Sequence, residues 1–384
     1  MNYNTPNTKN STVVVKAACA IVFCLFSFVY LYFYQVDMLS VAQHILSGGV
    51  TRYDRLIGAL VITLSLFLLQ LGISVFCRFN GKYHALTYFP SLLILAIITD
   101  IGPEIVCGLG SNHWLWFGPL ALLLWFGVAG ILKKYRFYEA PASAVGIFSR
   151  TMWINIMIMT VMLLFVGIAS DSYSVFHYRM HVERCLMERD IDKALETGKK
   201  SLETDSDLTM LRIYALARSG RLGDELFTYP VAGTSDDIIP SEDGAHCIIY
   251  PNDSIYKFLG AKPSRPVKAL TFLKGLIKHN LATDAVRDYI LCGYLIDRNL
   301  DSFIYHLPKF YEIDDSLPRH YREALILYTH QRSNPALVYH NVVMDTDFND
   351  MQALERQYKT EAARKRKVFG QYAGTYWWYY KYMK

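Results

Sequence analysis

TMWINIMIMTVMLLFVGIASD, residues 151–171, is the last long apolar stretch of the chain, and it decides the architecture of the protein. No charged residue lies between Met152 and Ala169. An α-helix rises about 1.5 Å per residue, so roughly 20 apolar residues cross the hydrocarbon core of a bilayer. The residues that follow are of mixed polarity. The sequence therefore predicts an all-α protein, with a polytopic membrane domain over residues 13–171 and a soluble domain over residues 172–384.

Four further apolar stretches precede this one. The first is too long for a signal peptide, and it ends in the bulky sequence YLYFYQVDM, where a cleavage site needs small residues. The third is the shortest and runs directly into Asp100. Residues 38–46, followed by two glycines, predict a short interfacial helix, and the polar residues 1–12 are predicted to be disordered. The predicted spans are residues 13–34, 56–77, 86–99, 114–132 and 152–170.

The distribution of charge predicts the orientation. Ten Lys/Arg and five Asp/Glu precede Asp171, whereas 29 of each follow from there on, out of totals of 39 and 34. With a cytoplasmic N-terminus, the short inside loops hold eight Lys/Arg and the outside loops two; three arginines just after the last span weaken this contrast. Because short cytoplasmic loops are enriched in Lys and Arg, five spans place the soluble domain outside the cytoplasm. We expect a bacterial inner-membrane protein with a periplasmic C-terminal domain.

The soluble domain shows the pattern of helical hairpins. Polar corners at Arg189-Asp190 and Ser219-Gly220 predict helix pairs over residues 182–203 and 208–227. The two segments superpose at a spacing of 31 residues, which resembles the two-helix tetratricopeptide repeat of about 34 residues. A stretch rich in Pro and Gly, residues 228–265, predicts an irregular insert whose apolar pieces form a small strand or pack on the helices. Further helices are predicted at 266–279, 282–298, 300–307 and 318–331, followed by one final charged helix at 349–368.

The layout as a whole resembles an uncharacterised family of integral membrane proteins of the Bacteroides type, which carry a helical, tetratricopeptide-like C-terminal domain. The resemblance rests on the order of the segments and on the sequences PNDSIYKFLGAKPSRP, residues 251–266, and YREALILYTHQR, residues 321–332. It covers nearly the whole chain. It implies a membrane location but no known activity.

Several classes of function find no support in the sequence. It contains no G-x-S-x-G, no H-E-x-x-H and no P-loop pattern, and its cysteines lack metal-ligand spacing. Cys185, Cys247 and Cys292 are interpreted as buried thiols, with one disulfide among them as the alternative. The basic run at residues 364–367 favours a solvated helix face over a nucleic-acid contact. We expect no cofactor, no metal and no nucleic-acid partner.

Ionisable residues beside a membrane span form the strongest chemical candidate. Asp100, Glu104 and His113 follow the third apolar stretch, in TDIGPEIVCGLGSNHW. Such residues are costly in a membrane and therefore indicate function, as a proton relay, metal ligand or acid–base group. Gly102-Pro103 indicates that the span ends there. The alternative is therefore a solvated outside loop.

The C-terminal stretch FGQYAGTYWWYYKYMK is unusually aromatic. Disordered tails contain few aromatic residues, so we expect it to stabilise the soluble domain or its membrane contact. It is interpreted as a membrane-interface anchor, a surface for a partner, or a capping helix packed on the last hairpin. The residues assigned to a partner or membrane surface are Tyr372, Tyr376, Trp377, Trp378 and Tyr380.

Two functions from different classes remain open. The first is a membrane-anchored scaffold that presents its helical domain to a protein partner outside the cytoplasm. The second is a membrane-embedded enzyme or transporter with an accessory soluble domain. The spans hold almost no charged residue near the middle of the membrane, where a transporter needs groups that bind ions or substrates. The scaffold is therefore preferred, and an enzymatic activity is not expected.

Overall fold

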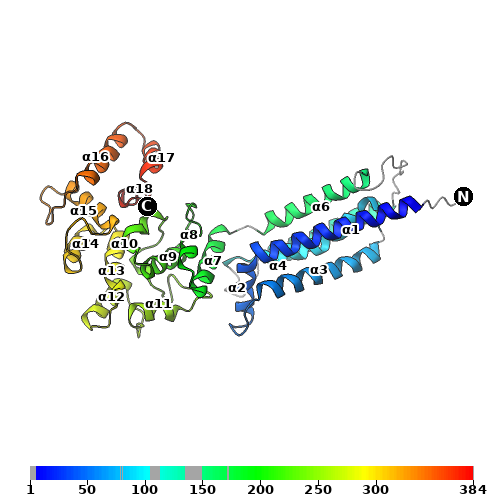
Figure 1. Ribbon diagram of the computed structural model, residues 1–384, viewed down its shortest axis with the longest axis horizontal. Helices are drawn as coiled ribbons and strands as arrows, with labels where there is room; N and C mark the ends of the chain where they lie inside the picture. Colours follow the sequence, from blue (N-terminus) through cyan, green and yellow to red (C-terminus); the bar gives the residue numbers. More distant parts are fainter. Residues whose placement is uncertain are drawn as a thin grey trace. The chain divides into compact units, whose positions relative to one another are not determined.

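The computed structural model describes residues 6–77, 79, 81–103, 113–134, 149–170 and 173–383. All regular secondary structure over these residues is helical, which confirms the predicted all-α class (Figure 1). The chain divides into two compact units, Met1–His177 and Tyr178–Lys384. We call them the membrane unit and the soluble unit.

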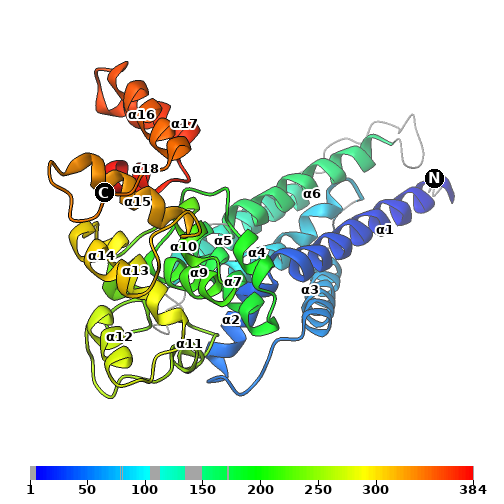
Figure 2. The same ribbon diagram turned by 60° about the vertical axis from the view of Figure 1, so that its left-hand side comes forward.

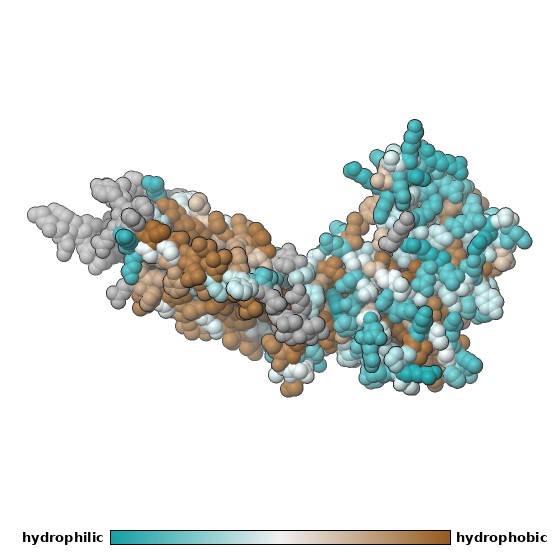
Figure 3. Space-filling view, turned by 180° about the vertical axis from the view of Figure 1, so that it is seen from behind, coloured by the Kyte–Doolittle hydropathy of each residue, from teal (hydrophilic) through white to brown (hydrophobic). Residues whose placement is uncertain are grey.

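The membrane unit is built on long apolar helices. Within the described residues, four helices are long and apolar enough to cross a membrane. They are α1 (Pro6–Val29, continued by η1, Tyr30–Tyr34), α3 (Arg55–Cys77), α5 (His113–Lys134) and α6 (Arg150–Ala169). Much of the visible surface of this unit is hydrophobic, whereas that of the soluble unit is mainly hydrophilic (Figure 3). A surface of this kind is suited to lipid and indicates membrane association.

The predicted third span differs from the other four. It forms the helix α4, Phe89–Thr99, which has 11 residues and follows the 3-10 helix η2, Gly81–Tyr88. A helix of this length is about 16 Å long, roughly half the thickness of the hydrocarbon core. Most of α4 is buried, and the helix packs against α3, α5 and α6.

Side chains from three helices bind η2. Asn155 accepts the backbone N–H of Ala85 at 2.8 Å, Trp125 donates to the backbone carbonyl of Leu86 at 2.9 Å, and Gln70 donates to the side-chain hydroxyl of Thr87 at 2.9 Å. Irregular backbone at membrane depth is tolerated only where protein or water satisfies its polar groups. Helices α3, α5 and α6 therefore hold η2 in place.

The N-terminal part of the unit partly follows the predictions. Helix α1 begins at Pro6, so the stretch predicted to be disordered is helical from that residue, and residues 1–5 lie outside the described part of the chain. A helix is confirmed where the short interfacial one is predicted; it is α2, Val36–Leu46, while its position at a membrane interface stays a prediction. Gly48 and Gly49 follow it with φ of 58° and 80°, a left-handed conformation that ends the helix at little cost.

The soluble unit repeats one type of helix corner. Arg189, Gly220 and Arg298 have φ of 63°, 68° and 57°, and at each corner the next N–H bonds back to the carbonyl five residues earlier. This is the Schellman pattern, and it confirms the predicted corners. The second helix of each pair is short, with six, four and seven residues. The pairs are α7 (Ser174–Glu188) and α8 (Ile191–Glu196), α9 (Ser206–Arg218) and α10 (Leu222–Glu225), and α13 (Ala285–Ile296) and α14 (Leu300–His306).

The insert over residues 228–265 packs on these helices and forms no strand in the described chain. It contains the 3-10 helix η5, Ser235–Ile238, and the helix α11, Asn252–Leu259. Its segment 246–250 is fixed by the buried carboxylate of Glu183, which accepts the N–H groups of Ile248, Ile249 and Tyr250 at 2.6–3.1 Å. Of the two predicted alternatives for the apolar pieces of the insert, a small strand or packing on the helices, the structure shows packing. Helices α12 (Ala269–Lys278) and α15 (Arg319–Gln331) follow.

The prediction of one final helix at 349–368 is wrong. The chain forms two helices instead, α16 (Val342–Arg356) and α17 (Glu361–Tyr372), which lie side by side and project from the rest of the soluble unit (Figure 2). In one continuous helix, Phe348 and Val368 would lie about 30 Å apart. Both are buried in the structure, because the turn between the helices folds α17 back onto the last helix, α18 (Tyr376–Tyr382). We call α16 and α17 the arm.

Candidate functional site

The structure brings Asp100 and His113 together in the membrane unit. Asp100 lies at the end of α4, and its Oδ2 is 3.2 Å from Nε2 of His113. The same oxygen accepts the indole N–H of Trp114 at 2.7 Å. The carboxylate is closed to solvent, with 1% of its side chain exposed, whereas the imidazole is 57% exposed. Glu104, the third member of the predicted set, lies outside the described residues.

This arrangement is that of a supported histidine. A carboxylate beside an imidazole fixes the orientation of the ring, as in many proton-transfer sites. The indole of Trp114 covers the same carboxylate oxygen, so the open face of the cluster is the imidazole. The contribution of Trp114 was not predicted. The signal was its position next to His113, at the start of an apolar helix.

The aromatic C-terminus forms part of the core of the soluble unit. Tyr376, Trp377 and Trp378 on α18 are buried, whereas Tyr372 and Tyr380 are half-buried. The first three are therefore core residues and do not form an open surface in this structure. Their arrangement matches the capping-helix interpretation.

Glu323 on α15 ties α18 to the core. Its carboxylate accepts the N–H of Tyr376 at 2.7 Å and Nδ1–H of His320 at 2.9 Å, and its carbonyl accepts the indole N–H of Trp377 at 2.7 Å. Nε2 of His320 accepts the N–H of Phe227 at 3.2 Å, so the imidazole joins two chain segments. The buried carboxylate is paired through hydrogen bonds, as burial requires.

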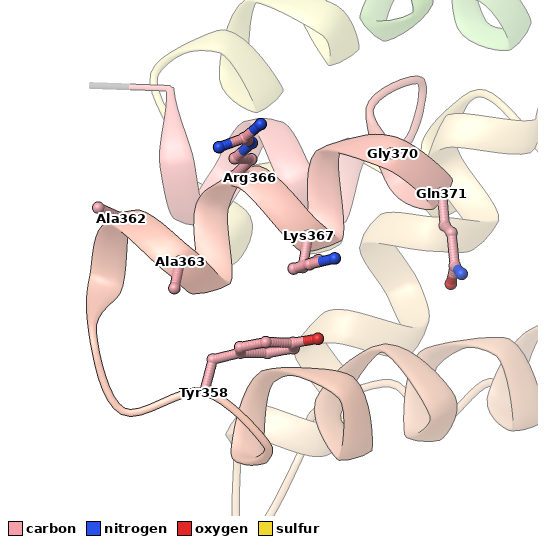
Figure 4. Close-up of a pocket in the computed structure, with 7 residues that line it drawn as sticks. All are labelled: Tyr358, Ala362, Ala363, Arg366, Lys367, Gly370 and Gln371. Carbon is pink, nitrogen blue, oxygen red and sulfur yellow. The ribbon is translucent and has the colours of Figure 1, made fainter.

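The arm offers an open cleft beside α17. The cleft has a volume of about 820 Å³. Tyr358, in the turn between the two helices, lies beside α17 on the same side as Lys367 and Gln371, whereas the Arg366 side chain projects from the other side of the helix (Figure 4). The remaining lining residues, Ala362, Ala363 and Gly370, are small. A cleft lined by two cationic side chains, an aromatic ring and an amide can bind an anionic group, such as a carboxylate on an apolar or helical segment.

The half-buried carboxylate of Asp288, a residue that the sequence pattern does not mark, joins α13 to α15. Asp288 accepts the phenol O–H groups of Tyr311 and Tyr321 at 2.6 and 2.9 Å. Burial raises the pKa of the Asp288 carboxyl, and the two phenol donors oppose that rise. Cys292 lies beside Tyr321, and burial raises the pKa of its thiol. Such a thiol is protonated at neutral pH and is not a nucleophile. Cys185, Cys247 and Cys292 are all free and buried, as predicted.

Comparison with known proteins gives a match for the C-terminal third of the chain. Residues 265–383 match a family described as a family of unknown function (DUF6057). The matched region contains the helices α12 to α18 and therefore the arm and the Glu323 network. No curated protein and no solved structure is significantly similar to the chain.

Proposed function

We propose that the protein is a membrane-anchored binding protein whose soluble unit presents the arm to a protein partner. The feature that supports this most directly is the open surface of the arm. Helices α16 and α17 have 15 and 12 residues, yet only Phe348, Met351 and Val368 are buried on them. Two helices of this length normally bury a continuous apolar stripe. Here most of their surface is left available for contact.

The corners of the soluble unit support a scaffold role. Three helix pairs have the same backbone geometry at the corner between their helices. If these pairs stack like the units of a tetratricopeptide protein, they give the arm a rigid base. We propose that this part of the chain is related to repeat proteins of that type. It would then hold the arm at a fixed place on a membrane-anchored unit.

The role of the arm is tested by capture from detergent extracts of the native host. We expect the doubly substituted chain Arg366→Glu/Lys367→Glu to capture at least about tenfold less of the partner than the native chain. The reason is that like charges facing each other across an interface cost several kcal/mol. The control, Lys193→Glu/Lys200→Glu, reverses two exposed cations on the first hairpin. Equal capture by the two variants would contradict the proposal.

We further propose that the protein lies in the inner membrane of a Bacteroides-type bacterium, with its N-terminus in the cytoplasm and its soluble unit in the periplasm. The excess of Lys and Arg in the predicted inside loops supports this orientation. The proposal also requires the short segment of η2 and α4 to count as a crossing. At about 2 Å per residue in a 3-10 helix and 1.5 Å in an α-helix, the apolar segment Tyr83–Thr99 reaches about 28 Å.

A topology reporter fused after residue 384 tests this orientation. We expect a reporter that works only outside the cytoplasm to be active there, and one fused after residue 134, at the end of α5, to report the cytoplasm. A cytoplasmic signal at the C-terminus together with an extracytoplasmic signal after residue 134 would show that α4 does not cross. A cytoplasmic signal at both points would show instead that α6 does not cross.

A further inference from the structure

The arm carries opposite charge on its two helices. Helix α16 holds four Asp/Glu and one Arg, a formal charge of −3, whereas α17 holds one Glu and four Lys/Arg, a formal charge of +3. The soluble half as a whole is balanced. The arm therefore separates negative charge on α16 from positive charge on α17, although the two nearly cancel in total.

These charges do not neutralise each other inside the arm. Asp347 and Asp350 on α16 are exposed, as are the cations of residues 365–367 on α17. Within the part of the chain that the structure describes, none of these five side chains forms a hydrogen bond or an ion pair. By contrast, Asp345 lies 3.2 Å from His330, and Glu355 lies 2.6 Å from Lys381. The five exposed side chains therefore have no hydrogen-bond or ion-pair partner among the described residues.

We propose that the partner of the arm is a second copy of this chain, with α16 of each copy lying against α17 of the other. The inference rests on the binding role proposed above and names its partner. A two-fold axis brings each surface of one copy onto the complementary surface of the other. The acidic and basic helices of one hairpin then each meet a helix of opposite charge, and two hairpins make a four-helix bundle.

The shape of α17 permits this contact. Ala362, Ala363 and Gly370 line the cleft with small side chains, and a Cβ built at Gly370 would meet no atom within 4 Å. The distance between packed helices depends on the side chains between them, so small residues allow a close approach. Arg366 and Lys367 lie beside this strip (Figure 4).

Helix α16 presents matching groups. Asp347 and Asp350 are three residues apart and therefore lie on one face of the helix, one turn apart. Val342 and Val343 at the start of α16 are 84% and 68% exposed, which gives the contact apolar area to bury. Exposed ion pairs are individually weak. Confinement of both copies to one membrane raises their effective concentration, so that a weak contact is populated.

An anionic lipid surface would use only half of the arm. It would attract the cations of α17 and repel the neighbouring carboxylates of α16, since polybasic segments bind anionic lipid through charge. A second copy uses both helices. For this reason the charge pattern favours self-association.

Charge reversal in full-length chains tests the inference. Two copies with different tags are expressed in one membrane, one copy is captured in mild detergent, and the other is quantified. The basic-helix variant is Lys365→Glu/Arg366→Glu/Lys367→Glu, and the acidic-helix variant is Asp347→Lys/Asp350→Lys. We expect each variant to lose at least about tenfold of its self-capture, because like charges then face each other. A mixture of the two variants is expected to recover it, since both contacts are then attractive again.

The mixture gives the test its specificity. Misfolding of either variant would not be repaired by a partner of opposite charge, and the chain carrying all five substitutions is expected to self-capture like the native chain. Self-capture by the single variants equal to that of the native chain, or no recovery in the mixture, would overturn the inference. A further outcome separates the two proposals. If the native chain does not capture itself, but captures another protein that the Arg366→Glu/Lys367→Glu chain fails to capture, then the partner is not a second copy and the proposed binding role is retained.

Discussion

Replacement of Glu183 by alanine is expected to lower the free energy of unfolding of the soluble unit by about 3–5 kcal/mol, the cost of breaking a buried charge pair. The Glu183 side chain is fully buried and forms an ion pair with Arg179 at 3.3 Å. Three backbone N–H groups of the insert also donate to it. Alanine leaves the three N–H groups and Nε of Arg179 without this acceptor.

The remaining partners of Arg179 would not compensate for this loss. Arg179 also bonds to Asp207 and to the carbonyl of His246, and Asp207 accepts the N–H of His246 at 2.9 Å. These contacts fix only the start of the segment 246–250. Burial raises the pKa of the Glu183 carboxyl, while Arg179 and the three N–H groups oppose that rise. The insert is therefore attached to α7 mainly through this one carboxylate.

Protease resistance of the full chain in membranes gives the measurement. The Glu183→Ala chain is expected to be cleaved within residues 240–250 at temperatures where the native chain resists, and Glu183→Gln, which keeps one acceptor oxygen, is expected to lie between the two. The control is Glu188→Ala, an exposed glutamate on the same helix, whose effect should stay within about 0.5 kcal/mol. Identical cleavage of the Glu183→Ala and Glu188→Ala chains would show that the network does not hold the insert.

Sequence alone predicts the helices and corners of the soluble unit because their signals are local. Gly220 and the polar residues around Arg189 and Arg298 end their helices through backbone conformation, which depends on a few neighbouring residues. The long apolar helices are equally visible from length and composition. These features need no knowledge of what packs against them.

The features that sequence reasoning missed depend on distant partners. The arm folds as two helices, and both Phe348 and Val368 are buried. The pattern of residues along the sequence does not reveal that these two side chains are buried together. The role of Glu183 depends on an insert about 65 residues away. Its only local signal is a charge between the buried Met180 and Leu186 of α7.

The candidate site in the membrane unit is intermediate between these cases. Asp100 and His113 were singled out from their position beside an apolar stretch, and the structure places them 3.2 Å apart. Trp114 shares the carboxylate, but nothing in the sequence shows that the ring turns toward it. Residue types and position place both residues, with Glu104, in one candidate set, but they do not predict the contact between Asp100 and His113. The direction of the third side chain came from packing.

Replacement of Trp377 by alanine is expected to lower the free energy of unfolding by about 3–5 kcal/mol, the usual cost of deleting a buried Trp or Phe side chain. Trp377 is 2% exposed, its indole N–H donates to the carbonyl of Glu323 at 2.7 Å, and its ring lies 5.1 Å from that of Phe348. Alanine removes the packing and leaves a cavity between α15, α16 and α18. For a unit of this size the melting temperature should fall by roughly 6–20 °C.

Tyr380→Ala is the matched control. Tyr380 lies on the same helix and is aromatic, but it is half-buried and its hydroxyl meets only Gln331, at 3.4 Å. Its loss should cost no more than about 1 kcal/mol. Deletion of residues 371–384 should be at least as damaging as Trp377→Ala. Melting of the soluble unit is followed in the full chain in detergent, by far-UV circular dichroism together with protease resistance.

The two variants also separate packing from surface binding in the aromatic segment. Trp377 holds Phe348 of α16, and Trp378 lies 5.3 Å from Phe369 of α17, so the base of the arm rests on buried rings of α18. Loosening that base should release the arm, and capture through the arm should then fall for Trp377→Ala but not for Tyr380→Ala. If Trp377→Ala melts like the native chain, the ring is not part of a packed core, and its place against Glu323 and Phe348 has no bearing on stability.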